Sequence, residues 1–475
     1  MMKSLFWFRN DLRVSDNYAL ARAIRESEEV IAIYLITPKT WKQHHVAGCK
    51  VDFILQNLKQ LSKVLWEQKI PLLIRQTQTF DSGVKVLKDL CEAHGINSLY
   101  FNYEYPLDER QRDKKIKEVL GEDIDINGEH GNLVLSPGKV LSKEGTPLKV
   151  FTPFKKAWII AAEEHHAWHQ TNQSHKMFKQ TICPDEVPES ITGFSHQLSK
   201  IHWKAGEEAA HKNLENFCEE SVFKYHQQRD FPDLNATSRL SPYLAIGTIS
   251  PRQCITMALR AADIPELNLM ERNKGVAVWI SELIWREFYQ HITYFFPEVC
   301  KYKPFKSKTN DIPWNDKEEW LTAWQQGLTG FPLVDAAMRQ LTTIGWMHNR
   351  LRMVVAMFLT KILLLDWRLG EKFFSENLID GEFSANNGGW QWCASTGTDA
   401  VPYFRIFNPT TQSERFDPQG KFIKQYCPEL KNLEIKSIHE PYAKNKSYDN
   451  LDYPKPIVDY KVQRKKTLEI FKDYN

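Results

Sequence analysis

Residues 4–35 read SLFWFRNDLRVSDNYALARAIRESEEVIAIYL, and this stretch predicts the fold of the first part of the chain. Residues 4–8 and 30–35 are short apolar runs typical of buried strands, and the segment between them, 17–28, has the length and mixed polarity of a helix. The alternation continues, with further strands expected at 71–75 and 98–103 and further helices at 51–68, 84–94 and 109–120. Such alternation predicts an α/β domain with a doubly wound parallel sheet and helices on both faces.

Local signals refine this α/β pattern. Asp16 and Asp81 are expected to cap the helices that follow them, and Gly95 is expected to end the helix at 84–94. Neither GxGxxG nor GxxxxGK[ST] follows any of the expected strands. The domain therefore lacks the two common loops that cradle a phosphate.

The second half of the chain has a different periodicity. From about residue 206 the apolar residues recur at three- and four-residue intervals, as in Leu351, Val354, Val355 and Phe358. We therefore expect an α/β domain over 1–130, a proline-punctuated connector over 131–205 with one helix at 154–164, and an all-helical domain over 206–475.

Composition and charge narrow the function classes. The 475 residues include 62 Lys and Arg against 59 Asp and Glu, so a nucleic-acid surface would have to be local. Eight cysteines without a CxxC pair argue against a disulfide framework, a zinc ribbon or an iron–sulfur cluster. No apolar run has the length of a signal peptide core or a transmembrane helix, so we expect a cytoplasmic protein that contacts no membrane. His165, His166 and His169 have ligand-like spacing, but a polar helix end is the favoured interpretation because no acid or cysteine supports a metal.

The segment 278–289, VWISELIWREFY, combines aromatic and charged residues on one helix face. Trp279, Glu282, Arg286 and Tyr289 fall close together at helical spacing. One interpretation is a packed helix on which Glu282 pairs with Arg286. The other is a cavity with aromatic walls and one polar handle, suited to a flat polar ring system.

Three further segments carry polar side chains next to apolar runs. Residues 345–353, GWMHNRLRM, place Asn349 and Arg352 on one face, and residues 380–392, DGEFSANNGGWQW, place acids and amides before two tryptophans. Asp380 is a candidate partner for Arg352, since a buried arginine needs a carboxylate. Residues 237–241, TSRLS, resemble a helix N-terminus whose hydroxyls and N–H groups can hold a phosphate, although most such segments only cap helices.

Together with WFRNDLR at 7–13 and ASTGTD at 394–399, these segments resemble the photolyase/cryptochrome family over nearly the whole chain. The resemblance is closest to the class I, bacterial-type photolyases that repair cyclobutane pyrimidine dimers. It implies an α/β domain followed by an all-α FAD-binding domain, with FAD active as the reduced anion. The implied enzyme is a carbon–carbon lyase in which excited reduced FAD transfers an electron to a flipped-out dimer in DNA.

Two alternatives remain open at this point. A cryptochrome-like blue-light photoreceptor shares the fold, but such proteins usually carry a long C-terminal extension and this chain ends at Asn475. A flavin oxidoreductase or electron carrier would need a nicotinamide site, and the sequence has no glycine-rich strand–helix turn for one.

The resemblance also implies roles for individual residues. The FAD-binding residues would be Tyr225, Thr237, Ser238, Arg239, Leu240, Ser241, Trp279, Glu282, Arg286, Asn349, Arg352, Asp380, Gly381, Glu382 and Asn386. Asn386 would lie near the flavin N5, where many signalling cryptochromes carry an acid, so this residue favours repair over signalling.

The partner implied by the resemblance is single- or double-stranded DNA that contains cyclobutane pyrimidine dimers, bound by a monomer. The DNA-binding residues would be Arg229, Glu282, Trp285, Arg286, Tyr289, Asn349, Arg350, Met353, Trp392 and Gln412. Glu282 and Asn386 would be catalytic, and Met347 and His348 stand where (6-4) photolyases carry a histidine pair, which favours the cyclobutane lesion.

Trp390, Trp367 and Trp314 match the family's electron-hopping chain. Trp314 lies in a polar loop and is expected at the surface. Trp367 follows an apolar run and is expected to be buried, as a route from solvent to the flavin requires.

An antenna is also implied, with 5,10-methenyltetrahydrofolate as the chromophore and His44, Asp108, Glu109, Cys300 and Lys301 as its site. Position 108 is Asp where the folate pattern has Asn, which leaves the identity of the antenna open. Position 382 is Glu where the flavin pattern has Asp, and we expect this longer side chain to shift a flavin contact without abolishing it.

Overall fold

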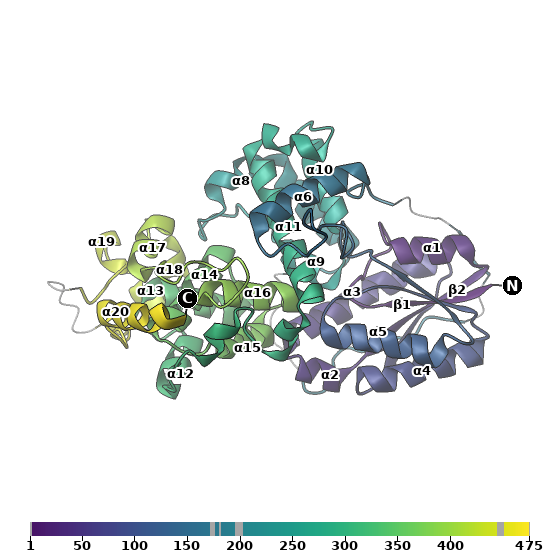
Figure 1. Ribbon diagram of the computed structural model, residues 1–475, viewed down its shortest axis with the longest axis horizontal. Coiled ribbons are helices and arrows are strands. Elements are labelled where there is room, and N and C mark those ends of the chain that lie inside the picture. The colour runs from purple at the N-terminus through teal and green to yellow at the C-terminus, as the bar shows by residue number, and fades with distance from the viewer. Residues whose placement is uncertain (1, 172–175, 180–181, 195–202, 444–450, 475) are drawn as a thin grey trace. The chain divides into compact units, whose positions relative to one another are not determined.

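The computed structural model describes residues 2–171, 176–179, 182–194, 203–443 and 451–474 (Figure 1). By packing, the chain divides into two compact units. Unit 1 comprises Met1–His226, Ser238–Pro297 and Ile379–Glu382, and unit 2 comprises Gln227–Thr237, Glu298–Leu378 and Phe383–Asn475. The expected domain limits at 130 and 205 stay a prediction.

Unit 1 contains a five-stranded parallel sheet with the strand order β3-β2-β1-β4-β5. The strands are β1 (Lys3–Phe8), β2 (Glu29–Ile36), β3 (Leu72–Gln76), β4 (Ser98–Asn102) and β5 (Asp125–Glu129). The chain order reverses at β1, which has β2 on one side and β4 on the other. The expected doubly wound parallel sheet is therefore confirmed.

Strand β5 is the one strand that the apolar pattern missed. Its sequence, DINGE, is mostly polar, and four of its five residues are partly or fully exposed. As an edge strand it pairs only with β4 and needs no continuous apolar run. The other four strands contribute the apolar core of the sheet, which includes Leu5, Ile33, Leu73 and Phe101.

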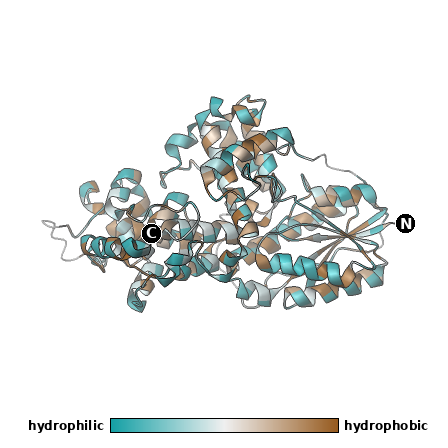
Figure 2. Ribbon diagram, in the orientation of Figure 1, coloured by the Kyte–Doolittle hydropathy of each residue, from teal (hydrophilic) through white to brown (hydrophobic). Residues whose placement is uncertain are grey.

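Helices cover both faces of this sheet, with α1 on one side and α4 and α5 together on the other (Figure 1). Helices α2 and α3 lie between β2 and β3 in sequence, and the helices of unit 1 from α6 onward follow the last strand. The helical elements are α1 (Tyr18–Glu26), α2 (Pro38–Gln43), α3 (Gly48–Glu67), α4 (Phe80–His94), α5 (Leu107–Leu120), α6 (Phe151–Glu164), α7 (Glu207–Asn216), η1 (Phe217–Ser221), α8 (Val222–Gln228), α9 (Ser241–Ile246), α10 (Pro251–Ala261), η2 (Leu267–Arg272) and α11 (Lys274–Phe295). Figure 2 shows α5 as mostly hydrophilic, as its run of charged residues requires.

Both expected aspartate caps are wrong by one or two residues. Asn17 caps α1 by accepting a hydrogen bond from the Leu20 N–H, while Asp16 has a positive φ and binds the Arg252 guanidinium at 2.9 Å. Thr79 caps α4 through a capping box, which leaves Asp81 in the first turn. Tertiary bonds outcompete local capping at Asp16. Gly95 does end α4 in the left-handed conformation, as expected.

Unit 2 is helical, and the described residues after 206 add no strand to the sheet. Its elements are η3 (Pro297–Lys301), η4 (Ser307–Asp311), α12 (Glu318–Gln326), α13 (Pro332–Ile344), α14 (Asn349–Met357), η5 (Phe358–Ile362), α15 (Trp367–Asn377), α16 (Phe383–Ala394), α17 (Pro409–Phe416), α18 (Lys421–Tyr426), η6 (Pro428–Leu430), α19 (Ile435–Ile438), α20 (Tyr460–Phe471) and η7 (Lys472–Tyr474). One large apolar core joins α12 to α18 and is built around Trp324, Leu351, Phe358 and Trp390.

Neither a membrane-spanning helix nor a metal-binding cluster is found in the part of the chain that the structure describes. No helix there is both long and apolar enough to cross a membrane. Nor do the described residues form a group of three or more His, Cys, Asp or Glu side chains placed to hold a metal ion.

Candidate functional site

Helix α11 presents the aromatic face that its sequence predicts. It begins behind Asn273, whose side chain accepts hydrogen bonds from two N–H groups of the first turn. Glu282, Trp285 and Tyr289 are half-buried on one side, while Leu283 and Phe288 are buried on the other. The helix is thus packed along one face and leaves a polar and aromatic face partly open.

Trp285 on this face is held flat by a residue that the sequence did not single out. Its ring stacks on Phe151, with centroids 3.6 Å apart and an interplanar angle of 9°. Tyr289 lies one turn further on, with its ring 5.6 Å from Trp285. A stacked support of this kind fixes the plane of an indole, as a stacking surface for another flat ring requires.

The guanidinium of Arg286 is held by two main-chain carbonyl groups. It donates to the carbonyl oxygens of Asn132 and Leu244, each at 3.3 Å. These bonds orient the guanidinium and leave its charge uncompensated by the two carbonyls. A cation held this way favours a bound anion.

Two of the expected FAD residues lie close to Phe217, another residue that the sequence did not single out. Trp279 is buried with its ring 5.0 Å from Phe217, and Tyr225 packs edge-on against the same ring at 5.8 Å. Helix α9 begins at Ser241 with Leu240 in the N-cap position, and no side chain caps it. The expected helix N-terminus at 237–241 is therefore confirmed, and its use as a phosphate site stays a prediction. Arg239 adopts a positive φ that turns the chain just before the helix.

The loop 379–382 belongs to unit 1 and is anchored from α3. Lys50 is buried and donates from Nζ to the carbonyl oxygen of Gly381 at 2.6 Å. Burial lowers the pKa of Lys50, and the charges of Glu382, Glu104 and Asp380 oppose that shift. Lys50 thus places a cation beside the two acids that the sequence assigned to the flavin.

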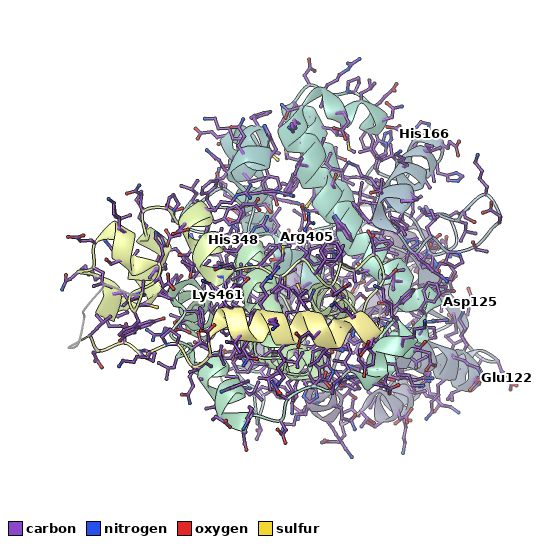
Figure 3. All side chains as sticks on the ribbon, turned by 60° about the vertical axis from the view of Figure 1, so that its left-hand side comes forward. Glu122, Asp125, His166, His348, Arg405 and Lys461 are labelled. Carbon is purple, nitrogen blue, oxygen red and sulfur yellow. The ribbon has the colours of Figure 1, made fainter. Side chains whose placement is uncertain are left out.

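In unit 2, the first turn of α14 carries the expected polar residues. His348 (labelled in Figure 3) caps this helix, with Nδ1 accepting from the Arg350 N–H at 3.2 Å. Arg352 donates from Nε to the carbonyl oxygen of Met347 at 2.8 Å, and both Arg352 and Met353 are half-buried. The predicted Arg352–Asp380 pair would join residues of different units and stays a prediction.

Arg350 has a protein partner that the sequence did not suggest. Its Nη2 lies 2.8 Å from Oδ1 of Asp230, and its guanidinium carbon lies 4.6 Å from the centre of the Phe416 ring. Arg229 precedes Asp230 in the same unit and is half-buried. The carboxyl group of Asp230 therefore partly neutralises a residue predicted to bind phosphate.

Gln412 and Trp392 are two further members of the predicted DNA set in unit 2. Both are half-buried, and Oε1 of Gln412 has no hydrogen-bond partner among the described residues. Because this oxygen is itself buried, a contact of Gln412 with a phosphate would use its amide N–H groups as donors.

Asn386, at the first turn of α16, is oriented by two hydrogen bonds. Its Nδ2 donates to the main-chain oxygen of Glu371 and to Oγ of Ser375, each at 2.9 Å. Within the described residues its Oδ1 accepts no hydrogen bond. The fixed amide therefore presents a carbonyl oxygen that can accept from a protonated ring nitrogen.

A chain of buried amides continues from this point. Asn387 donates to Oε1 of Glu371 and accepts from Gln391, each at 2.9 Å. Gln391 in turn accepts from the Phe305 N–H at 2.8 Å. Glu371 was not among the predicted site residues, because a single acid on an amphipathic helix gives no signal from sequence.

The three tryptophans of the predicted electron-hopping chain all lie in unit 2. Trp367 and Trp390 are buried, as expected for Trp367, while Trp314 is half-buried and packs 6.1 Å from the Phe471 ring. The predicted surface position of Trp314 is thus only partly met, because Phe471 covers one side of its ring.

Neighbouring residues connect these tryptophan positions. Asn315 donates to the carbonyl oxygens of Leu364 and Leu363, which ties the Trp314 loop to the segment before Trp367. On α15, a Cβ atom added to Gly370 would lie 2.1 Å from Cη2 of Trp390. Glycine at this position lets α15 approach the indole of Trp390.

Three of the five predicted antenna residues come together in unit 1. Nε2 of His44 lies 3.0 Å from Oδ2 of Asp108, and Nδ1 lies 3.7 Å from Oε1 of Glu109. Burial raises the pKa of Glu109, although the charges of His44 and Arg112 oppose this. Cys300 and Lys301 belong to unit 2, where Lys301 pairs with Glu298 at 2.6 Å.

Comparison with known proteins matches both parts of the chain. A family model described as "DNA photolyase" matches residues 4–172, and one described as "FAD binding domain of DNA photolyase" matches residues 279–473. The chain is 44% identical to the deoxyribodipyrimidine photo-lyase of Escherichia coli (strain K12) over 99% of its own length and 98% of that protein.

Solved structures give the same picture. A bacterial class III photolyase from Agrobacterium tumefaciens superposes with a TM-score of 0.88 at 32% identity, covering 99% of this chain and 97% of that one. An archaeal photolyase from Sulfolobus tokodaii, solved with two FAD molecules, superposes with a TM-score of 0.79 at 29% identity over 99% of this chain and 100% of that one.

Proposed function

The chain belongs to the DNA photolyase family, and from this premise we propose that it repairs cyclobutane pyrimidine dimers in DNA by light-driven electron transfer from FAD. It is an FAD-binding enzyme of the deoxyribodipyrimidine photo-lyase type. The observation that carries the repair proposal is Asn386, whose two N–H groups are used within the protein and whose carbonyl oxygen is not. An acid at that position would favour the cryptochrome-like alternative.

The residues present fit a bound flavin. When bound and reduced, FAD supplies the light-excited electron that opens the cyclobutane ring and takes the electron back afterwards. Asn386 would accept from the protonated flavin N5, and Arg352 would offset the negative charge of the reduced ring. Tyr225 and the hydroxyls of Thr237, Ser238 and Ser241 would hold the phosphates and ribitol, while Trp279 packs behind the site on Phe217.

The α11 face would receive the lesion. Trp285 offers a flat surface already stacked on Phe151, and Glu282 offers the carboxylate for the base edges. Met353 and Trp392 would supply further apolar wall. Stacking of about 1–3 kcal/mol per base offsets the few kcal/mol that flipping costs. Glu282 would also stabilise the charge that develops on the dimer.

Backbone phosphates would be met by Arg229, Arg286, Arg350 and Gln412. Of these, Arg350 is partly neutralised by Asp230 at 2.8 Å, so it must exchange a carboxylate for a phosphate when DNA binds. This exchange lowers the affinity gained from Arg350 on any DNA, damaged or not, and leaves more of the selectivity to the lesion pocket.

The antenna would be 5,10-methenyltetrahydrofolate, held by His44, Asp108 and Glu109 with Cys300 and Lys301. The hydrogen bond between His44 and Asp108 supports a polar recognition site there, and it also occupies the side chain at the position where the folate pattern has Asn. Release of the bound chromophores by denaturation, followed by their absorption spectra, identifies the antenna directly.

One assay tests the proposed activity. Purified protein that has been reduced and lit with blue light is expected to restore the thymine absorbance of ultraviolet-irradiated oligothymidine, whereas the same sample kept in the dark is not. Protein that contains FAD and is fully reduced, yet restores no absorbance in the light, would contradict dimer repair. The cryptochrome-like alternative predicts that reduced, FAD-containing protein restores no thymine absorbance in the light.

A further inference from the structure

The carboxyl group of Glu371 is buried between α15 and α16 in unit 2. The residue is 4% exposed. Its Oε1 accepts one hydrogen bond, from Nδ2 of Asn387 at 2.9 Å, and its Oε2 has no hydrogen-bond partner within the described residues. No ion pair to Glu371 is formed in that part of the chain either. The group thus has far less support than a buried negative charge requires.

Other buried acids of unit 2 are supported more fully. Asp335 accepts from the N–H groups of Thr329 and Gly330 and from the Thr329 hydroxyl, and Asp417 accepts from the N–H groups of Phe422 and Ile423. Both of their carboxyl oxygens therefore have partners. Glu371 differs because one of its oxygens has no donor, an arrangement that fits a neutral, protonated carboxyl better than a carboxylate, whose negative charge needs donors.

The charged groups near Glu371 do not supply the support for a negative charge that its missing hydrogen bonds leave out. Burial raises its pKa to about 7, while the hydrogen bond from Asn387 and the charge of Arg368 lower it and the charge of Asp366 raises it. Arg368 and Asp366 lie at the start of α15 and form an ion pair with each other. Of the elements packed against α15, the described part of α16 has Cys393 as its titratable group, and η5 has the buried Lys361, which donates to Ser395.

Glu371 is also joined to the residue that faces the proposed flavin ring. Its main-chain oxygen accepts from Asn386 at 2.9 Å, while its side chain accepts from Asn387, the next residue along α16. A change in the charge of the carboxyl group therefore acts within one residue of the Asn386 amide. In a buried site with few mobile dipoles, such a change is weakly screened.

We propose that Glu371 is a positioning residue that takes up a proton when the cofactor beside Asn386 gains an electron, so that reduction of the cofactor depends on pH in the neutral range. The proposal rests on the proposed function. In the step, one electron from an external one-electron reductant enters the bound cofactor, and one proton from solvent forms an O–H bond on the carboxylate of Glu371. The added negative charge is thereby balanced within the protein.

The first measurement is a redox titration of bound FAD, followed by its absorption, at about pH 6, 7 and 8. For the one-electron step that yields the reduced anion, the midpoint potential of the wild-type protein is expected to fall as pH rises across this range. In Glu371→Gln the fall is expected to disappear, because glutamine still accepts from Asn387 but cannot ionise. Glu376→Gln is the matched control, since Glu376 lies on α15, pairs with Lys372 and is well exposed.

The second measurement needs no variant. An infrared difference spectrum between the reduced and oxidised protein is expected to contain a protonated carboxyl band that shifts when glutamate is ¹³C-labelled. A wild-type potential that does not change with pH, a Glu371→Gln potential that keeps the wild-type slope, or the absence of this band would each overturn the proposal while leaving bound FAD in place. Protein that binds no FAD would instead refute the proposed function.

Discussion

Glu287 on α11 and Glu371 on α15 are both buried glutamates, yet their surroundings differ in a way that separates structure from function. Glu287 accepts from the N–H groups of Val134 and Leu135 and from the Trp158 indole, so both of its carboxyl oxygens have donors and together join three segments of unit 1. Glu371 accepts one hydrogen bond and keeps one oxygen without a partner in the described structure.

Burial raises the pKa of both groups, although three donors oppose the shift at Glu287 and one donor does so at Glu371. A buried acid whose oxygens all have donors stabilises the fold, because any change in its charge or length leaves those buried donors without a hydrogen-bond partner. An under-supplied acid stores a destabilising interaction, and such interactions gather at functional sites. The comparison predicts opposite behaviour for the two residues on mutation.

The largest effect is expected for Glu287→Ala. It strands three buried donors, each of which costs about 1–3 kcal/mol when unsatisfied, so the free energy of unfolding should fall by about 3 kcal/mol or more. Urea denaturation followed by circular dichroism measures this. Glu282→Ala on the same helix is the control and should change the free energy of unfolding by less than about 1 kcal/mol, since Glu282 is half-buried. Equal losses in the two variants would remove the distinction.

Glu371→Gln is expected to show the opposite sign at neutral pH. The folded-state pKa of Glu371, about 7, lies above its ordinary value of 4.5, so the folded protein binds more protons than the unfolded chain in that window. The stabilising contribution is therefore complete below about pH 4.5 and is lost as pH rises through about 7. A pKa raised this far corresponds to about 3 kcal/mol.

Because glutamine does not ionise, Glu371→Gln should gain stability relative to the wild type by about that amount between pH 4.5 and pH 8. Urea midpoints at about pH 5 and pH 8 for the two proteins measure the difference. A constant difference across this range would mean that the charge of Glu371 does not change between pH 5 and pH 8, which would contradict the raised pKa.

Gly370→Ala tests the packing next to Glu371. The new Cβ would meet the Trp390 ring at 2.1 Å, so overpacking should cost about 1–3 kcal/mol and displace the indole. Photoreduction of oxidised FAD should slow, while repair by enzyme that is already reduced should change less. Gly389→Ala is the matched control on α16, where an added Cβ meets nothing within 4 Å. A variant that photoreduces as fast as this control would exclude Trp390 from the electron route.

Glu282→Ala tests the function of the acid on the partly open side of α11, five residues before Glu287. A hydrogen bond that involves a charged group contributes about 1.5–3 kcal/mol, so affinity for dimer-containing DNA should fall by about tenfold to a hundredfold. Affinity for undamaged DNA and FAD content should stay the same. Titration of matched damaged and undamaged duplexes gives both values. A variant that binds and repairs like the parent would make Glu282 a structural residue of the packed helix.

The smallest effect is expected for Asp230→Asn, because its ion pair with Arg350 is partly open to solvent and surface ion pairs contribute about 0–1 kcal/mol. The substitution frees Arg350 for phosphate, so undamaged DNA should bind less than tenfold more tightly and the dependence on salt should steepen by about one unit. Asp233→Asn changes the same charge nearby and is the control. An unchanged salt slope in Asp230→Asn would remove Arg350 from the phosphate-contacting set.

Structural features that depend only on nearby residues in the chain could be predicted from the sequence. The parallel sheet followed from apolar runs of strand length, the helical second half from three- and four-residue spacing, and the stop at Gly95 from the need for a left-handed residue. Strand β5 could not be predicted in this way, because an edge strand with polar residues carries no apolar run. The cap at Asp16 was wrong because its carboxylate is used by Arg252, which lies 236 positions away in the chain.

The candidate site divides along the same line. The sequence by itself determined the family, because the motif segments follow one another along the chain in the order that the family has. The family in turn predicts the functions of Glu282, Asn386 and Trp390. Only the tertiary structure decided which side chains support them: Phe151 behind Trp285, Lys50 on Gly381, Asp230 on Arg350 and Glu371 beside Asn386. The physical reason is that burial and hydrogen-bond satisfaction depend on neighbours brought together by folding, and a lone Phe, Lys, Asp or Glu carries no sign of them in the sequence.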